Sequence, residues 1–429
     1  MSCEEAFDNI PKNWLILEVG DLVKRGILEK PMDGNHGSIH PKAKDYVNQG
    51  IPFIMAADLK NGYIDFDRCK FITHQQAKTL KKGFAKKGDV LLTHKGTIGR
   101  VALVKDLSTQ YLVLTPQVTY YRVRNNKLLL NKYLLYYFMS EKFQHFFLAF
   151  AGSGSTRNYL GITHQLKLPV VLPPIEEQHR IANILSTIDD KIELNHQINQ
   201  DLEEMAQAIF KSWFIDFEPF RDGEFVDSEL GPIPKGWRVS KLGEVCTVTG
   251  GGTPKTKVNE YWENGDILWA TPSDMTAQSS LVIFDTSKKI TELGLQKSSA
   301  KLLPKGTVLM TSRATIGYTS IAMAEISTNQ GFINIICDKE VSNYFMLFFI
   351  RSFKDKIKRI ANGSTFMEVS KKNFKELDIV VPPSNWIEKF DQHIEPIIEN
   401  VYKIEQQNQI LSNLRDTLLP KLMSGEIRV

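Results

Sequence analysis

The sequence predicts an α+β fold, in which two repeated mixed α/β domains are separated by two long antiparallel coiled-coil helices. The stretch KGDVLLTHKGTIG at 87–99 recurs as KGTVLMTSRATIG at 305–317, with eight of thirteen positions identical. Each copy is followed by a long segment whose apolar residues alternate at spacings of four and three, which is the heptad pattern of a coiled coil. A chain of 429 residues has room for two such domains.

The repeat extends along the whole chain, because further short stretches match in the same order. The matched pairs are PKNWLILEVGDLV (11–23) with PKGWRVSKLGEVC (234–246), YLLYYF (133–138) with YFMLFF (344–349), and VVLPP (170–174) with IVVPP (379–383). The offset between partners falls from 223 to 209 residues, so the first copy is longer between its anchors. We infer one scaffold that carries different loops, and loops are where binding residues usually lie.

Each copy mixes short strands with helices. Runs such as VLLTHKGTIGRVALV and YLVLTPQVTYYRV have the composition of strands and are separated by Gly and Pro turns. Helical runs follow, notably NKYLLYYFMSEKFQHFFLAF in the first copy and NYFMLFFIRSFKDKIKRIA in the second. We therefore expect a curved sheet with helices in each copy.

The two long segments should be helices that pair with each other. Each begins after a double proline, because proline is tolerated in the first turn of a helix, and Pro420 is expected to end or bend the last turn of the second. Asn199 and Asn408 occupy equivalent positions in the two heptad patterns. An Asn in such a seam fixes register at a cost in stability. The alternative is that both Asn residues lie at a solvated end of the helix pair.

These patterns divide the chain into four parts. We predict a first mixed domain at 1–172, a first spacer helix at 173–220, a second mixed domain at 221–383 and a second spacer helix at 384–429. Each spacer is about forty residues, hence about 60 Å long.

Composition indicates a cytoplasmic protein. The net charge of +4 neither requires nor excludes a polyanionic partner. The N-terminus lacks the apolar region of a signal peptide, and no apolar stretch is long enough to cross a bilayer, so we expect no membrane contact. Cys3, Cys69, Cys246 and Cys337 lie far apart, without a CxxC pair, and are expected to be free thiols.

Basic residues gather at predicted turns, interleaved with Ser, Thr, Asn and Gly, at matching places in the two copies. Such a composition suits contact with the phosphates and base edges of double-stranded DNA. A single Lys is more simply explained as solvated charge, but the set as a whole favours nucleic acid. The candidate DNA-binding residues are Lys86, Lys87, His94, Lys95, Arg100, Ser155, Thr156, Arg157, Lys255, Lys257, Ser312, Arg313, Lys358, Arg359, Ser364 and Thr365.

Some repeated positions have an alternative role, because recurrence in both copies favours scaffold over readout. We interpret Gly96, Gly99 and Gly317 as turn glycines. Thr97, Ile98, Thr315 and Ile316 are interpreted as structural residues.

No catalytic apparatus is evident in the sequence. FAGSG at 150–154 is similar to the glycine-rich cofactor loop of S-adenosylmethionine-dependent methyltransferases, but such a loop should follow a strand, and here it follows a helical run. We therefore expect no cofactor and no metal in this chain. Two other classes stay open: a fused methyltransferase, and a coiled-coil scaffold without a DNA role.

Together these stretches resemble the specificity (S) subunit of a type I restriction–modification system. The resemblance covers nearly the whole chain and is most specific at PPIEEQHRIA (173–182), and KSWFIDFEPF (211–220) is also typical of the family's central region. The second copy departs from this pattern, with PPSNWIEKF at 382–390.

The resemblance implies that the chain is not catalytic and that its mixed domains are target recognition domains, each reading one half of a split DNA target. It implies that the helices set the gap between the halves and dock two modification (methyltransferase) subunits. Restriction (endonuclease/translocase) subunits would complete the enzyme, so S-adenosylmethionine, ATP and Mg are expected on partner subunits. The specificity subunit of a related type II system is the alternative.

Overall fold

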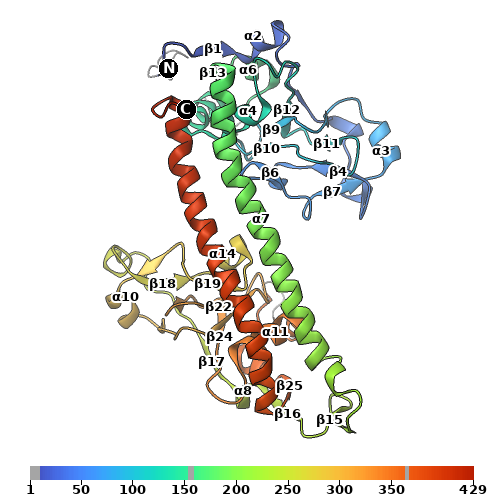
Figure 1. Cartoon of the computed structure of the whole chain (residues 1–429), viewed down its shortest axis with the longest axis vertical. Coiled ribbons are helices and arrows are strands. Elements are labelled where there is room, and N and C mark those ends of the chain that lie inside the picture. The colour runs from blue at the N-terminus through green and yellow to red at the C-terminus, as the bar shows by residue number, and fades with distance from the viewer. Residues whose placement is uncertain (1–9, 153–158, 363–366) are drawn as a thin grey trace. The chain divides into compact units, whose positions relative to one another are not determined.

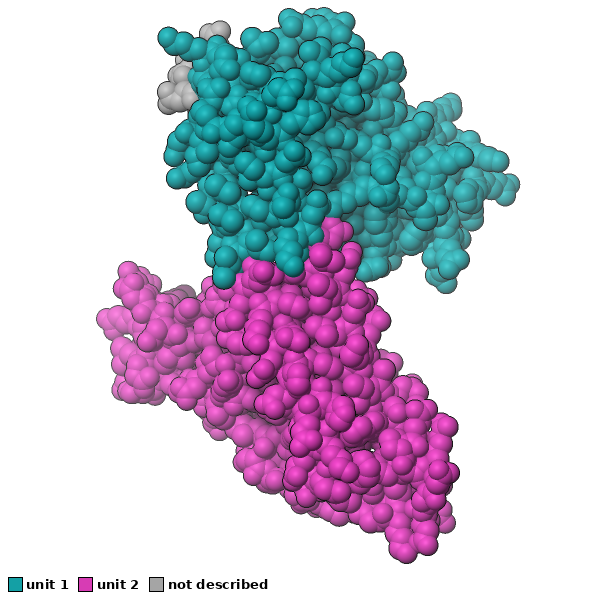
Figure 2. Space-filling view, viewed as in Figure 1, with its two compact units in different colours: residues 1–192, 410–429 teal, residues 193–409 magenta. Residues whose placement is uncertain are grey.

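The computed structural model describes residues 10–152, 159–362 and 367–429. The chain forms two compact units, unit 1 from residues 1–192 and 410–429 and unit 2 from residues 193–409 (Figure 2). Each unit therefore combines one copy of the repeat with parts of both long helices.

Both units contain the same antiparallel sheet. In unit 1 the strand order is β10-β9-β12-β2, and in unit 2 it is β22-β21-β24-β17, with β19 added in parallel beside β22. The bounds are β2 Met32–Asp33, β9 Val90–Thr93, β10 Val101–Leu103, β12 Val118–Tyr121, β17 Thr247–Gly250, β19 Val282–Ile283, β21 Val308–Thr311, β22 Thr319–Ala322 and β24 Phe332–Ile336. The predicted internal repeat is thus confirmed in the strand order.

A second sheet also recurs. In unit 1, β4 pairs in parallel with β11 and antiparallel with β7, and in unit 2, β18 pairs in parallel with β23 and antiparallel with β20. Unit 1 extends this sheet with β3 and β8, which accounts for part of its greater length. The bounds are β3 Tyr46–Val47, β4 Ile51–Ile54, β7 Lys70–Ile72, β8 Phe84–Ala85, β11 Leu112–Leu114, β18 Ile267–Ala270, β20 Lys289–Ile290 and β23 Ser327–Thr328.

Two-stranded ribbons join the ends of each repeated copy. β1 pairs with β13 in unit 1, and β16 pairs with β25 in unit 2. Their bounds are β1 Leu15–Glu18, β13 Pro169–Leu172, β16 Arg238–Lys241 and β25 Asp378–Val381. Smaller ribbons are β5 Leu59–Lys60 with β6 Tyr63–Ile64, and β14 Phe225–Val226 with β15 Ile233–Pro234.

A largely apolar helix packs against the repeated sheet in each unit, α4 against β10 and α11 against β22. Six consecutive residues of each are buried, Tyr133–Phe138 and Phe345–Ile350, as expected for a helix with apolar residues on all faces. The helix bounds are α2 Val19–Lys24, α3 His74–Lys78, α4 Asn131–Met139, α5 Glu141–Gly152, α6 Ile162–Gln165, α8 Leu242–Val245, α9 Pro272–Gln278, α10 Glu292–Gln296, α11 Asn343–Ser352, α12 Lys354–Arg359 and α13 Lys371–Lys375.

The two long helices form as predicted. α7 spans Ile175–Phe214 and α14 spans Ser384–Ser424, each beginning directly after its double proline. In unit 1, Arg415 Nη1 donates to Asp189 Oδ1 at 3.0 Å. α14 continues past Pro420 to Ser424, so Pro420 does not end the helix. The alternative, that Pro420 bends the last turn, stays a prediction.

A polar layer sets the register of the helices within unit 2. Asn195 Nδ2 donates to Asn408 Oδ1 at 2.7 Å, and Asn199 Nδ2 donates to Glu405 Oε1 at 2.9 Å. From Asn195 to Asn199 the chain of α7 advances, while their partners on α14 go back from Asn408 to Glu405. The two segments therefore run antiparallel, as predicted (Figure 1). Asn408 is 6% exposed, so it does not lie at a solvated end.

Two expectations from composition concern the part of the chain that the structure describes. Within it, no helix combines the length and the apolar character that a bilayer crossing requires. Cys69, Cys246 and Cys337 are free thiols, and Cys3 lies outside the described residues.

Candidate nucleic-acid interface

Two loops leave the same end of the repeated sheet in unit 1. β12 begins at Val118, which pairs with Thr93, the last residue of β9. The next residue, Thr119, pairs with Asp33, the last residue of β2. The segments that follow are the edge-strand loop, residues 34–45, and the repeated loop, residues 94–100. The ladder register therefore brings both loops to one end of the sheet.

Unit 2 has the same arrangement. β24 begins at Phe332, which pairs with Thr311 at the end of β21, and its next residue pairs with Gly250 at the end of β17. The edge-strand loop here is residues 251–258 and the repeated loop is residues 312–318. Three predicted cations, Lys255, Lys257 and Arg313, come to this end of the sheet.

Matched backbone hydrogen bonds fix the repeated loop. The N–H of Gly99 donates to the carbonyl of Thr93 at 2.9 Å, and the N–H of Gly317 donates to the carbonyl of Thr311 at 2.9 Å. The predicted turn glycines are confirmed by positive φ angles: Gly96 at 75°, Gly99 at 88° and Gly317 at 90°. The recurrence of the motif is therefore explained by the geometry of this turn.

Two residues that were expected to face DNA have buried side chains. His94 is 0% exposed, its Nδ1 lies 3.0 Å from the carbonyl oxygen of Leu160, and burial lowers the pKa of its imidazole even though Asp33 opposes the shift. Ser312 is 2% exposed. The backbone of each joins its loop to neighbouring segments, which turns the side chain inward. This corrects the expectation that these two side chains contact DNA.

The adjacent cations are more accessible. Lys95 is exposed, with its Nζ 5.6 Å from the ring centroid of Tyr159. Arg313 is half-exposed and donates from Nη2 to both carboxylate oxygens of Glu368, at 2.9 and 2.8 Å. Tyr159 and Glu368 follow the two GST stretches, so each repeated loop meets the equivalent segment. The predicted residues Ser155, Thr156, Arg157, Ser364 and Thr365 lie outside the described residues.

The remaining predicted residues divide between two places. Arg100 is exposed and donates from Nη1 to the carbonyls of Ala56 and Ala57, both at 3.2 Å. Lys358 and Arg359 are exposed in the last turn of α12.

Lys86 and Lys87 lie away from the repeated loop. They precede β9, whereas the repeated loop follows it, so the strand separates the two sets. Lys87 also forms an ion pair with the exposed carboxylate of Asp106. The structure therefore does not bring these two lysines together with Lys95.

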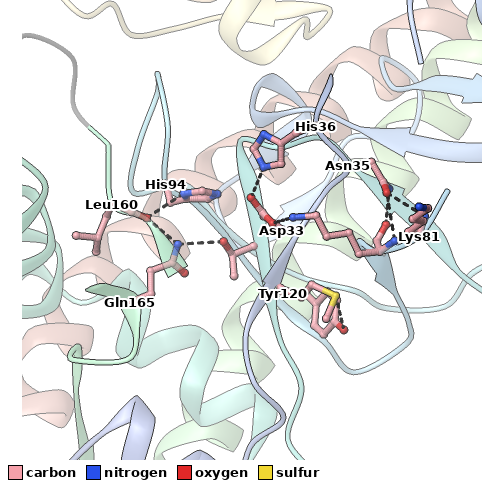
Figure 3. Close-up of polar contacts among 11 residues, drawn as sticks. Asp33, Asn35, His36, Lys81, His94, Tyr120, Leu160 and Gln165 are labelled. Carbon is pink, nitrogen blue, oxygen red and sulfur yellow. Dashed lines mark hydrogen bonds and ion pairs between the residues drawn. The ribbon is translucent and has the colours of Figure 1, made fainter. Parts of the chain in front are cut away.

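Sequence reasoning missed a polar cluster at the base of the edge-strand loop in unit 1 (Figure 3). Asp33 is 5% exposed, accepts a hydrogen bond from Lys82 Nζ and lies 2.8 Å from His36 Nε2. Burial alone would raise the pKa of the Asp33 carboxyl, but these two partners hold that pKa below its ordinary value. The one available signal was position, since the two copies differ in length between their first anchor and the repeated loop.

Buried Asn35 holds the same loop. Its Oδ1 accepts the N–H of Lys81 at 2.9 Å and that of Lys82 at 3.3 Å, and its Nδ2 donates to the carbonyl of Lys82 at 2.6 Å. Asn35 is 2% exposed, so these bonds satisfy a polar group that burial would otherwise destabilise.

Among the residues that the structure describes, no group of three or more His, Cys, Asp or Glu side chains is close enough to hold a metal ion. The FAGSG stretch begins inside α5, which ends at Gly152, so it does not follow a strand as a cofactor loop should.

Comparison with known proteins gives a consistent result. Residues 11–204 and 234–415 match the family described as type I restriction modification DNA specificity domain. The chain is 29% identical to the type I restriction enzyme MjaIX specificity subunit of Methanocaldococcus jannaschii, over 99% of this chain and 96% of the relative. It is 26% identical to the HindI specificity subunit of Haemophilus influenzae, over 88% of this chain and 94% of the relative.

A solved structure supports the fold. The S subunit of a type I restriction–modification system from M. genitalium aligns with a TM-score of 0.55, over 97% of this chain and 96% of that chain. The sequence identity is 18%, so this likeness concerns the fold alone.

Proposed function

This chain belongs to the family of type I restriction modification DNA specificity domains, and from that membership we propose that it is the DNA-recognition subunit of a type I restriction–modification enzyme. Each unit reads one half of a bipartite target. The observation that carries the proposal is the pair of family matches, one for each copy of a shared scaffold with different loops. The relatives named above are type I subunits, which favours this class over a related type II system.

The helices supply the spacing between the half-sites. α7 and α14 are continuous, and each contributes residues to both units. B-DNA repeats every 34–36 Å, roughly, so a stiff spacer can set half-sites one turn or somewhat more apart. The same helices dock two modification subunits, and restriction subunits complete a cytoplasmic enzyme. S-adenosylmethionine, ATP and Mg bind to those partners, and we assign this chain no catalytic step.

At the interface we assign DNA contacts to the accessible cations beside the two loops. In unit 1 these are Lys95 and Arg100. In unit 2 they are Lys255, Lys257 and Arg313, with Lys358 and Arg359 at the end of α12. Exposed Lys and Arg side chains suit phosphate contact, which would give the complex a salt-dependent affinity.

Sequencing of methylated sites in DNA from cells that carry this chain with its modification subunit tests the proposal. We expect a bipartite motif with a fixed gap. Insertion of four residues, about one helical turn, into one spacer helix should change the gap and leave the bases of both halves unchanged. A continuous motif, or methyl transfer by this chain alone, would overturn the proposal, and DNA-independent assembly would favour the scaffold alternative.

A further inference from the structure

We propose that His36, oriented by Asp33, reads a base edge in the DNA half-site recognised by unit 1. This inference rests on the proposed function and deepens it, because it names a residue that determines sequence preference. It is carried by the position, anchoring and exposure of one loop.

Position is the first argument. The repeated loops, HKGTIGR at 94–100 and SRATIGY at 312–318, share the TIG turn and its backbone hydrogen bond, so this shared part cannot distinguish two different half-sites. The edge-strand loops lie at the same end of each sheet but differ in length and chemistry, GNHGSIHPKAKD in unit 1 and GGTPKTKV in unit 2. We therefore expect the edge-strand loops to determine how the two units differ in the DNA sequence that they prefer.

Anchoring is the second argument, because readout needs a side chain held in place before binding. A Cβ on Gly34 would lie 1.9 Å from the carbonyl oxygen of Leu114, so the loop begins in close contact with β11. In unit 2 the N–H of Gly252 donates to the carbonyl of Thr328, the last residue of β23, at 2.8 Å. Both loops thus start on the end of the equivalent parallel strand.

The third argument is the chemistry of His36 itself. Its side chain is 50% exposed, whereas that of its partner Asp33 is 7% exposed. The carboxylate fixes the ring by accepting the Nε2–H bond, and Lys82 holds the carboxylate in turn. Nδ1 has no partner within the described residues and is the ring atom left for a ligand.

A fixed imidazole of this kind matches the edges of bases in the major groove. As a neutral ring, Nδ1 accepts from adenine N6 or cytosine N4, and as an imidazolium it donates to guanine N7 or O6. Asp33 is then a positioning residue, since its carboxylate is buried and acts through His36. Figure 3 shows His36 above Asp33, with Asn35 and Lys81 to one side of this pair. Lys82 Nζ donates to the same carboxylate of Asp33.

Unit 2 presents a different set of groups at the equivalent place. Its edge-strand loop carries Thr253, whose hydroxyl donates to Gln330 Oε1, and the exposed cations Lys255 and Lys257. No carboxylate–histidine pair occurs in this loop. A change at His36 should therefore affect one half of the target only.

The test uses this chain in complex with its modification subunit, with methylation measured over a DNA library randomised at each target position. For His36→Ala we expect preference at one base pair of one half-site to relax about tenfold, with the other half and the gap unchanged. His145→Ala is the matched control, because His145 is an exposed histidine of the same unit, 73% exposed on α5.

Asp33→Asn provides the test of positioning. We expect it to relax preference at the same base pair by a smaller factor than His36→Ala, a readout that a merely structural role would not move, and thermal unfolding checks that unit 1 remains folded. Unchanged preference at every position in His36→Ala would overturn the inference. So would a uniform loss over all sequences with a weaker salt dependence, which indicates a phosphate contact. Failure of the proposed function would differ, because the unmodified complex would then show no bipartite motif.

Discussion

The surroundings of the repeated Trp, which we call the Trp corner, differ in chemistry between the two units: charged side chains in unit 1 and aromatic rings in unit 2. Trp14 in unit 1 and Trp237 in unit 2 are equivalent anchors, 4% and 6% exposed. In unit 1, Trp14 Nε1 donates to Glu177 Oε2 at 3.0 Å, and Arg428 Nε donates to Glu177 Oε1 at 2.7 Å. Glu177 is the third residue of α7, and the third residue of α14 is Trp386.

The corner in unit 2 is aromatic throughout. The ring centroid of Trp237 lies 4.9 Å from that of Phe220 and 5.3 Å from that of Phe217. Trp386 packs edge-on against Phe220, with centroids 4.6 Å apart.

The comparison shows that the repeated Trp occupies the same position in both copies of the scaffold, while the residues that contact it differ in chemistry. A charged pair depends on geometry and on the hydration of its ions, whereas an aromatic cluster depends on buried area. The two corners should therefore fail in different ways, and the two helix starts present different surfaces to a partner.

The largest effect is expected at the aromatic corner. Trp237→Ala should lower the free energy of unfolding of unit 2 by about 3–5 kcal/mol, because it removes a buried ring and leaves a cavity. The loss should be independent of salt. Denaturant unfolding combined with hydrogen exchange on unit 2 peptides measures it, with Trp262→Ala, which replaces a partly buried Trp of the same unit, as the comparison. A loss below about 1 kcal/mol would show that the corner repacks.

The charged corner should be weaker and sensitive to charge. Glu177→Gln keeps the shape and one acceptor for Trp14 but removes the ionic partner of Arg428, so we expect a loss of about 2 kcal/mol in unit 1. Arg428 is half-exposed, which limits the cost because its charge can be hydrated. The exposed neighbour Glu176→Gln is the control and should change little. Equal effects of the two substitutions would argue against the buried pair.

The repeated loops offer a reciprocal test of the shared scaffold. Gly96 has φ of 75°, and Ala314, at the same place in unit 2, has φ of 59°. A Cβ on Gly96 meets no atom closer than 3.9 Å, so only backbone strain opposes Gly96→Ala, and we expect a loss of about 1 kcal/mol. Ala314→Gly should be neutral or stabilising by less than that. Thermal unfolding measures both variants. A stabilising Gly96→Ala together with a destabilising Ala314→Gly would contradict the equivalence of the two repeated loops.

The last comparison concerns the pH dependence of a titratable group that unit 1 lacks. Burial raises the pKa of Asp391 to about 6, although a hydrogen bond from Ser342 opposes the shift, and Ala182 stands at the equivalent place on α7. The folded unit therefore binds a proton more tightly than the unfolded chain, so this group stabilises unit 2 at low pH and loses that contribution as pH rises through about 6.

Replacement of this carboxyl tests the assignment. Asp391→Asn should remove that part of the pH dependence between about pH 4 and pH 7, as measured by the unfolding midpoint against pH. An unchanged profile would assign the pH dependence to other groups.

The features that could be predicted from sequence were those with local or repeated signals. Heptads and double prolines predicted α7 and α14, and the matched anchors predicted two copies of one plan. Antiparallel pairing was predicted correctly. The residues that meet were not predicted: Asn195 donates to Asn408 and Asn199 donates to Glu405, because register depends on how the two helices are offset.

The candidate site was less predictable, because it depends on contacts between distant segments. His94 is buried since its loop joins the backbone of Gln117 and Leu160, which no local pattern reveals. Asp33 meets Lys82 across 49 residues of sequence. Recurrence marked the scaffold, and the reading residue that we propose, His36, belongs to a stretch that does not recur.

Unit 1 is discontinuous in the chain, since residues 410–429 complete it after the whole of unit 2. During synthesis the segment that carries Arg428 leaves the ribosome later than every residue of unit 2. Unit 1 is therefore completed after unit 2, and a frameshift after the codon for residue 409 would damage the unit whose translation began first.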